Sequence, residues 1–455
     1  TGTPSITIPF CELKCGKLSI PIQLSYHAGG IKVDQIASEV GIGWSLNAGG
    51  VIGHTIKKAN DLYSTRYIMS YDDLKNGRYL TASQIHSLKE RNIDSEPDIF
   101  SYNFLNYNGQ FIMDINGEFC NLREKKDLFI SKYGNGIKIV DLLGIEYIFE
   151  TQENSMIRTT PYNCDFSKPT ALYQSGSPSD TQKMITAYNL TKIVSADKKY
   201  WIDFTYVDEY YEVENKLSGS IYYNANHIYN SNSKKWVENG SISQKWNGIN
   251  HIANVPSGNF SKSRSYYWTK KISSIQTSTG ERISFSYMNT ERKDLLRSKA
   301  LKSVSQFNSN GNLLKTWQLN HDYFVADVKL EAGTLEQLTQ NYRLKLVSID
   351  EIAPIVGGGS LQKKYKLQYY GDNINDYQML YRNAMSGEDV WGCLNAKTNI
   401  NQAKSVNYLL PRLNKLNLED SDAINFYGRT EYGGSSDGLL TLMQFSSGSY
   451  KEVNK

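Results

Sequence analysis

Cysteine, proline and long apolar runs are all scarce in this sequence, and each scarcity excludes a class of protein. The chain of 455 residues has five cysteines, a small and odd number, so the disulfide framework of a small secreted domain is not expected. No run of about 18 apolar residues occurs, which excludes a membrane-spanning helix. Only 10 prolines stand against 34 glycines and 33 tyrosines, and this balance favours β-structure.

An excess of charge of one sign is also missing. The chain has 50 basic and 46 acidic side chains, a net charge of +4, and basic runs such as residues 123–127 are interleaved with acidic residues. The sequence therefore predicts no nucleic-acid partner, because such a partner requires a concentrated basic surface. The chain starts at Thr1 without a basic and then apolar leader, which is compatible with a removed signal sequence and does not fix the compartment.

Patterns of metal ligands are lacking as well. Cys11 and Cys15 would lie ~13 Å apart on an extended strand, too far to share an ion without a turn. The six histidines are scattered, without HExxH spacing, and no CxxC accompanies them. Residues 372–376 (DNIND) resemble a calcium loop until the third position, where isoleucine replaces an oxygen ligand. We therefore expect no metal and no cofactor.

The sequence has instead a strong alternation with a period of two residues. In residues 5–27 apolar side chains recur at every second position of two strands joined by a turn at 15–17. Pro9 and Pro21 remove donors from the ladder, so these strands are expected to bend there or to lie at an edge. A second layer must cover their apolar faces, formed by Ile6, Ile8, Phe10, Leu18, Ile20, Ile22, Leu24 and Tyr26.

The same hairpin module recurs along the chain: alternating apolar residues, a polar turn and an aromatic-rich strand. Copies lie at 190–206, 268–287, 300–323, 342–370 and 439–453, with variants at 111–122 and 137–150. A single hairpin is marginal in water, so the copies must pair side by side. The predicted fold is therefore mainly β, with extended, curving antiparallel sheets of successive long hairpins. Short helices are predicted at 81–88, 334–342 and 70–77.

The chain is too long to form one ordinary hydrophobic core, so it should divide into domains or extend as a repetitive sheet. We place an N-terminal hairpin region at 1–150, hairpin modules at 151–340 and C-terminal hairpin modules at 341–455, with one continuous β structure as the alternative. Residues 207–265 are rich in Asn, Ser, Gly and Lys, with aromatic residues at no steady period. This insertion is expected to be the least ordered region, as a functional loop or a small subdomain.

The stretch VGIGWSLNAGGVI, residues 40–52, begins like a dinucleotide motif but does not complete it. Leucine stands at the third glycine position, the Lys-Ser/Thr pair of a P-loop is missing, and Asn47 stands where GxSxG needs glycine. The alternate positions of Val40, Ile42, Trp44 and Leu46 predict a strand with Gly41 and Gly43 on its other face, where a second layer approaches closely. Trp44 would anchor that contact, and Gly49–Gly50 would form the following turn.

Acidic residues cluster without defining a catalytic pair. Asp34 and Glu39 precede the glycine stretch, and Glu388–Asp389 precede Trp391. The separation of two carboxylates that a glycosidase needs cannot be read from such pairs. We therefore assign no catalytic residue and expect no enzyme; a glycoside hydrolase remains a less favoured alternative.

Four segments together resemble the N-terminal region of the large Rhs/YD-repeat proteins of Bacteroidetes, a group with SpvB-like relatives. They are LSIPIQLSYHAGGIKVDQIASEVGIGWSLNAGGVI (18–52), EPDIFSYNFLNYNGQFIMD (96–114), EDVWGCLNAKTN (388–399) and GLLTLMQFSSGSYKEV (438–453). The tandem YD repeats themselves are missing. His54 stands where the family usually has arginine, and Cys393 replaces an aromatic residue.

The resemblance implies a secreted or cell-surface polypeptide whose β-hairpins wind into a partial or whole shell. The implied function is that of a non-enzymatic structural shell or scaffold segment, which encloses or presents a C-terminal effector of the same polypeptide or acts at the cell surface. A surface glycan or protein is a further candidate partner. The alternative function is a surface adhesin or glycan-binding module, suggested by the aromatic insertion at 207–265. The signature residues are Gly41, Gly43, Trp44, Asn47, Gly49, Gly50, Asp389, Trp391 and Gly392.

Overall fold

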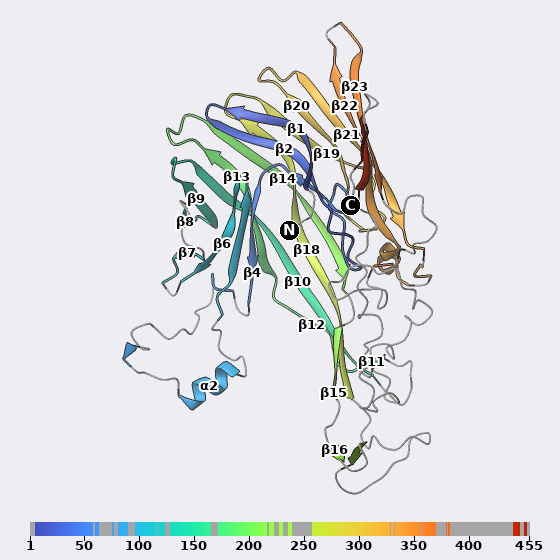
Figure 1. Ribbon diagram of the computed structural model, residues 1–455. Coiled ribbons are helices and arrows are strands. Elements are labelled where there is room, and N and C mark those ends of the chain that lie inside the picture. The colour runs from blue at the N-terminus through green and yellow to red at the C-terminus, as the bar shows by residue number, and fades with distance from the viewer. Residues whose placement is uncertain are drawn as a thin grey trace.

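The computed structural model confirms a mainly β fold (Figure 1). It describes residues 5–57, 60–62, 75–76, 81–89, 96–114, 116–122, 128–164, 172–215, 218–222, 227–230, 235–238, 257–327, 329–331, 333–355, 357–369, 379, 381–382, 440–445 and 450–452. Within these ranges, no helix has both the length and the apolar character needed to cross a membrane.

Strands make up most of the regular structure. In chain order they are β1 (Ser5–Cys15), β2 (Leu18–His27), β3 (Trp44–Asn47), β4 (Gly50–Thr55), β5 (Ile99–Phe104), β6 (Tyr107–Met113), β7 (Phe119–Asn121), β8 (Leu128–Tyr133), β9 (Gly136–Asp141), β10 (Glu146–Cys164), β11 (Leu172–Gln174), β12 (Ser179–Asp180), β13 (Met184–Val194), β14 (Trp201–Glu214), β15 (Ser218–Tyr222), β16 (His227–Asn230), β17 (Lys235–Glu238), β18 (Ser257–Thr277), β19 (Arg282–Tyr287), β20 (Leu301–Phe307), β21 (Leu313–Val325), β22 (Tyr342–Pro354), β23 (Ser360–Tyr369), β24 (Leu440–Phe445) and β25 (Tyr450–Glu452).

The helices are short, as the sequence predicts. They are α2 (Ala82–Lys89), α3 (Leu335–Leu338) and the 3-10 helix η1 (Thr339–Asn341). Thr334 and Gln337 form the capping box at the start of α3, so the hydroxyl of Thr334 accepts from the amide of Gln337. The helix predicted at 70–77 lies outside the described residues, apart from residues 75 and 76.

The main sheet is built from successive antiparallel hairpins, which confirms the repeated module. From β18 to β25 each strand pairs with the next one in chain order. The strands β4 to β7 form a second run, and β8 to β10 form a third. The runs meet where β10, β13, β14 and β18 form a closed ring of pairings, with β4 also paired to β13.

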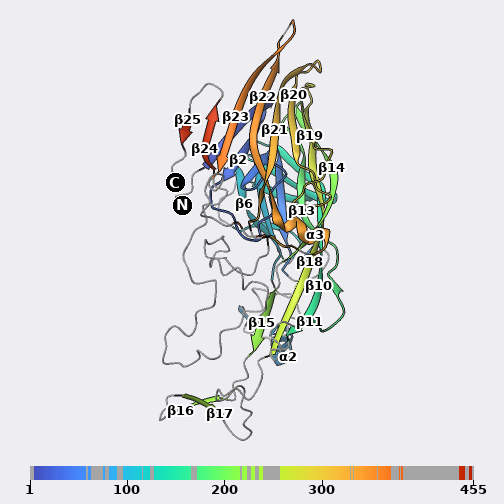
Figure 2. The same ribbon diagram turned by 90° about the vertical axis from the view of Figure 1, so that its right-hand side faces the viewer.

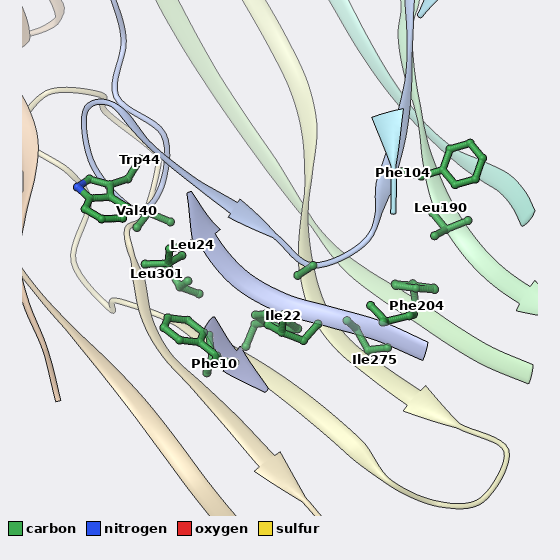
Figure 3. Packing of buried hydrophobic residues seen from close by; sticks show 14 of the residues in the cluster. Phe10, Ile22, Leu24, Val40, Trp44, Phe104, Leu190, Phe204, Ile275 and Leu301 are labelled. Carbon is green, nitrogen blue, oxygen red and sulfur yellow. The ribbon is translucent and has the colours of Figure 1, made fainter. Parts of the chain in front are cut away.

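A smaller second sheet, in the order β1–β2–β3, lies inside the curve of the main sheet. Figures 1 and 2 show the main sheet, from β14 round to β23, curving about the β1–β2 hairpin. The two sheets share one apolar cluster (Figure 3), in which the ring of Phe10 on β1 stacks on Trp317 of β21 at a centroid distance of 5.2 Å. The main sheet is therefore the second layer that the apolar faces of β1 and β2 require.

A β-bulge adapts β1 to this core. Its register on β2 shifts between Pro9 and Cys11, where the sequence predicts a bend. Ile8 before the bulge and Phe10 within it are buried, and after it the buried positions become odd-numbered, at Leu13 and Cys15. The extra residue thus keeps both halves of the strand facing the main sheet. In the described part of the chain β1 pairs with β2 alone, so it is also an edge strand.

The prediction that residues 207–265 are the least ordered region is wrong at both ends. β14 and β18 pair from Ile202↔Thr277 to Glu214↔Arg264, well into the expected insertion. Aromatic rings face each other across the two strands: Tyr210 packs at a tilt against Trp268 at 5.4 Å, and Tyr211 stacks on Tyr267 at 5.1 Å between ring centroids. These rings belong to the sheet, because directly opposed aromatic residues stabilise the pairing of their strands. The domain divisions at 150 and 340 stay predictions.

Replacing Phe10 with alanine tests the contact between the sheets. We expect Phe10→Ala to lower the free energy of unfolding by about 3–5 kcal/mol, because it leaves a cavity against Trp317. Phe129→Ala is the control, since that ring is 67% exposed and its loss should cost less than about 0.5 kcal/mol. Urea unfolding followed by tryptophan fluorescence measures both, and equal effects would contradict the two-layer core.

Candidate functional site

The glycine-tryptophan block is a tight turn followed by a short strand. β3 contains only Trp44–Asn47, and Gly41 and Gly43 have φ angles of +142° and +76°. The predicted strand over 40–46 is therefore wrong in its first half. Ile42 lies in no strand, and its amide donates to the carbonyl of Leu344 in β22 over 2.8 Å. Glycine is needed here because other residues rarely adopt these φ angles.

Two glycines of the block lie where a side chain has no room. A Cβ added at Gly41 would lie 2.9 Å from the backbone nitrogen of Leu346. A Cβ added at Gly50 would lie 2.3 Å from the Cβ of Phe104. Both distances are shorter than real Cβ contacts, so the backbone of the block packs directly against β22 on one side and β5 on the other.

Trp44 connects the block to the far end of the main sheet. Its side chain is buried, and its Nε1 donates to the hydroxyl of Tyr369 over 2.8 Å, across 325 positions of sequence. The Tyr369 hydroxyl donates in turn to the carbonyl of Leu346 over 2.7 Å. Tyr26 packs beside Trp44 at a centroid distance of 5.0 Å. A buried indole N–H needs such a partner, so this contact fixes the ring as well as burying it.

The other signature residues have smaller roles or fall outside the described ranges. Asn47 is exposed, and its Nδ2 donates to Oγ of Ser25 over 3.2 Å. The bend between β3 and β4 is formed by Ala48 and Gly49, whereas Gly50 is the first residue of β4, so the predicted turn at Gly49–Gly50 lies one residue too late. Asp389, Trp391 and Gly392 lie outside the described residues.

A buried ion pair holds the segment before the block, and the sequence analysis did not find it. Arg292 donates through Nη1 to the carbonyl of Ser38 (3.1 Å) and through Nη2 to that of Ala37 (2.9 Å). The same guanidinium contacts Asp294 through Nε (3.0 Å) and Nη2 (2.7 Å), and Asp294 also accepts from the amide of Leu344 (3.1 Å). Burial alone would lower the pKa of Arg292, but the Asp294 carboxylate outweighs burial and raises it.

Two more basic side chains, the buried Arg382 and the half-buried His321, support the same region. Nη2 of Arg382 donates to the carbonyl of Asp294 over 2.7 Å, and burial lowers the pKa of Arg382 to about 10. Nε2 of His321 lies 3.0 Å from the carbonyl of Val40, and burial lowers the pKa of His321 to about 4. The imidazole is therefore neutral at pH 7 and donates its Nε2–H to that carbonyl.

His54, where the resembling family usually has arginine, belongs to a separate buried polar cluster. Its Nδ1 lies 3.0 Å from the carbonyl of Ile185 and its Nε2 lies 2.9 Å from Oδ2 of Asp98, with both side chains of the pair fully buried. Burial raises the pKa of Asp98, but hydrogen bonds from His54 and from the amides of Asp61 and Lys57 outweigh it, and the pKa lies below its usual range. Both ring nitrogens are thus used inside the fold.

A cavity of about 530 Å³ lies where the main sheet forks. β13 pairs with β4 over Ala187–Asn189 and with β14 over Lys192–Val194, on the edge away from β10. β4 and β14 therefore pair with different parts of the same edge of β13, and the two strands separate from each other beyond it. The cavity lies between them, with Asn189 at the fork and residues 50–51 of β4 in its lining, and residues 36–39 and 46–49 complete the wall.

The basic groups of this cavity are already neutralised by the fold. Nζ of Lys271 contacts Oε1 of Glu209 at 2.6 Å, with the side chains only 10% and 9% exposed. Burial lowers the pKa of Lys271, and Glu209 offsets part of that effect. Arg292, the other cation on the inner side, is occupied by Asp294 and two carbonyls. Among the described residues, the carboxylate of Glu39 has no hydrogen bond or ion pair.

The described residues contain no group of three or more His, Cys, Asp or Glu side chains that could hold a metal ion. Cys15 is buried, with its Sγ 3.2 Å from Oγ of Ser278, while the calcium-like loop at 372–376 lies outside the described ranges. The expectation that the protein needs no metal or cofactor stays a prediction.

Comparison with known proteins leaves the chain without a family. No protein-family model matches it, and no curated protein matches it. Among solved structures it is similar to a chain of the Tc holotoxin pore of Photorhabdus luminescens that carries a TccC3 mutation, with 9% sequence identity and a TM-score of 0.34. The similarity covers 81% of this chain and 16% of that chain, so the protein spans a small part of the neighbour's length.

Gly43 and Gly311 make a matched pair for testing close approach in the block. Their φ angles are +76° and +80°, but a Cβ at Gly43 would lie 2.7 Å from the ring of Tyr26, while nothing lies within 4 Å of one at Gly311. We expect Gly311→Ala to cost about 1–2 kcal/mol for its φ alone. Gly43→Ala should cost about 1–3 kcal/mol more, because the buried Tyr26 ring must move. Thermal and urea unfolding measure both, and equal costs would show that the block tolerates a side chain there.

Asp98→Asn tests the buried histidine cluster. The folded-state pKa of Asp98 lies below its unfolded value, so its contribution is complete above pH ~4 and is lost as the pH falls through the folded pKa. We expect Asp98→Asn to cost about 3 kcal/mol at pH 7, since His54 loses its anionic partner.

The gap in stability between Asp98→Asn and the parent protein should narrow as the pH falls below ~4, the usual pKa of an aspartate, and towards the lower pKa of Asp98 in the folded protein. Asp34→Asn is the matched control, because Asp34 is exposed and should change stability by less than about 0.5 kcal/mol at either pH. Urea unfolding across the acid range gives the measurement. A gap that stays constant with pH would argue that Asp98 is not the anionic partner of His54.

Proposed function

We propose that this chain is a non-enzymatic wall segment of a larger exported protein of the Rhs type. The observation that carries the proposal is the two-layer arrangement, in which the main sheet curves about β1–β3. The side of β1–β3 away from the core has mostly polar side chains, exposed or half-exposed. The packing of the two layers keeps solvent and proteases out of the core between them. The polar side of the inner layer offers no apolar patch to a neighbouring chain.

The polar side of the small sheet is made of short hydrogen-bonding side chains. The hydroxyls of Ser25 and Ser45 lie 2.8 Å apart across β2 and β3, and Asn47 donates to Ser25. On β1 and β2 the hydroxyl of Ser19 donates to Glu12. Such a surface suits the inside of an enclosure, because an unfolded or partly folded effector would find few apolar contacts to hold it there.

The ionisable groups support a structural role rather than catalysis. The carboxylates on the cavity wall are Glu39 and Glu209, and Glu209 is committed to Lys271. The His54–Asp98 pair is sealed from solvent, so a substrate has no access to its proton. The proposed partner is an effector of the same polypeptide, and the proposed site is the cell exterior, both on the strength of the resemblance of residues 18–52 and of the segments that accompany it.

Limited proteolysis of the full-length protein tests enclosure. We expect the segment C-terminal to this chain to be digested at least tenfold more slowly in the full-length protein than as a free segment, because a closed wall excludes the protease. Trp44→Ala should remove part of that protection by loosening the inner layer, whereas Phe129→Ala, at an exposed ring, should not. Equal digestion of the free and tethered segments would refute enclosure.

A further inference from the structure

We propose that the cavity at the fork of the main sheet is a binding site for a neutral saccharide. The volume of about 530 Å³ falls within the range of about 300–1,000 Å³ that is typical of small-molecule sites. The cavity is a product of the topology, since β4 and β14 must separate after leaving the same edge of β13. The inference does not rest on the wall function, which concerns the polar side of β1–β3.

Side-chain amides form part of the polar lining. Gln23, Asn103 and Asn106 line the cavity. Within the described part of the chain their side chains form no hydrogen bond, so they can bond to a ligand. Asn103 and Asn106 are exposed and so mark the open side. Each amide carries two donors and one acceptor oxygen, which is the mixture that a hydroxyl-rich ligand satisfies in both directions.

Glu39 supplies the strong acceptor. Its backbone is fixed, because its carbonyl accepts from the amide of Leu301 over 2.9 Å, while its half-buried side chain has no partner among the described residues. Glu39 lines the cavity, and its carboxylate is close enough to Lys271 and Arg292 to raise the pKa of both against the lowering effect of burial. A carboxylate that accepts from ligand hydroxyls forms the stronger class of hydrogen bond.

The inner surface includes aromatic rings held in place. Tyr206 is fixed by the bond from its hydroxyl to the carbonyl of Leu190 at 2.6 Å, and Tyr211 is fixed by stacking on Tyr267. Both rings line the cavity beside Thr269. An amphipathic ring of this kind offers contact area to the apolar side of a sugar at little cost in entropy.

The charges decide between classes of ligand. An anion is disfavoured because all three cations of the lining are paired. Lys270 pairs with Asp208, Lys271 with Glu209 and Arg292 with Asp294. The carboxylate of Glu39 is then the charge of the lining that has no ion pair within the described part of the chain. An apolar ligand is disfavoured because it would strip water from Glu39 and the amides without replacing their hydrogen bonds. A neutral polyhydroxylated ligand satisfies both conditions.

Binding of neutral mono- and disaccharides to the complete 455-residue chain tests the proposal. The panel is glucose, galactose, mannose, N-acetylglucosamine, maltose and lactose, with glucuronate and glucosamine as the anionic and cationic comparisons. Saturation-transfer NMR and titration calorimetry should show saturable binding of at least one neutral sugar, and weaker binding of its charged counterpart. Absence of saturable binding across the panel would overturn the proposal, and binding of glucosamine alone would make the cavity a cation site instead.

Variants locate the binding. Glu39→Gln should weaken it by about tenfold through loss of the charged acceptor. Asn106→Trp should abolish it by filling the open side, at an exposed position where the fold tolerates the change. Glu331→Gln is the matched control, because Glu331 is exposed and remote from the cavity lining, and it should bind as the parent does.

Unfolding midpoints establish that each variant is folded before it is titrated. Unchanged binding in both Glu39→Gln and Asn106→Trp would place the sugar elsewhere and refute the site. Should Asn106→Trp fold poorly, Glu39→Gln alone still decides the question, since it removes a charge without changing the size of the side chain. Failure of this site leaves the digestion rates of the full-length protein unaffected, so the two proposals can fail separately.

Discussion

The arrangement of the two sheets depends on the buried carboxylate of Asp294 and the bonds that it forms. This carboxylate forms an ion pair with Arg292, whose guanidinium donates to the carbonyls of Ala37 and Ser38. It also accepts a hydrogen bond from the amide of Leu344, near the start of β22. A buried charge that loses one partner costs about 3–5 kcal/mol, so these contacts are favourable only when all segments are in place. The seating of the N-terminal segment is therefore coupled to the completion of the main sheet.

This coupling explains the composition of the glycine-tryptophan block. Once residues 37 and 38 are fixed, the following backbone must pass directly over β22, where Gly41 leaves no room for a Cβ beside Leu346. Trp44, at the end of this backbone segment, is then buried and donates its indole N–H to the hydroxyl of Tyr369. The glycines and the tryptophan are parts of one packing solution, which needs no phosphate or nucleophile to account for it.

The fork of the main sheet has consequences for function. A sheet that stayed continuous from β4 to β14 would have no room for a ligand behind it, whereas the divergence of the two strands from β13 opens a cavity with amides at its mouth and Glu39 within. The polar surface of β1–β3 and the cavity at its side give the proposed wall an inner surface that is both inert towards apolar chains and able to hold small polar molecules.

The sequence by itself determined the fold class, the hairpins and the need for a second layer, because period-two alternation is a local property that any strand pairing must respect. It also indicated the bulge in β1, since Pro9 cannot donate to the ladder. It misjudged residues 207–214, where polar composition favoured a loop and tertiary pairing with β18 made a strand. It also read residues 40–43 as strand, although their alternation results from a turn with positive φ at Gly41 and Gly43.

Only the tertiary structure decided which distant residues meet. Arg292, Asp294 and Arg382 follow no local pattern in the sequence. The bonds from Arg292 to residues 37 and 38, and from Arg382 to Asp294, depend on the way the main sheet curves. The sequence analysis noted Glu39 beside the glycine stretch but gave it no role, and only the fold placed it at the cavity. The physical reason is that periodicity reports which side of a strand faces the core, whereas ion pairs and cavities depend on register and curvature, which arise from the sum of many pairings.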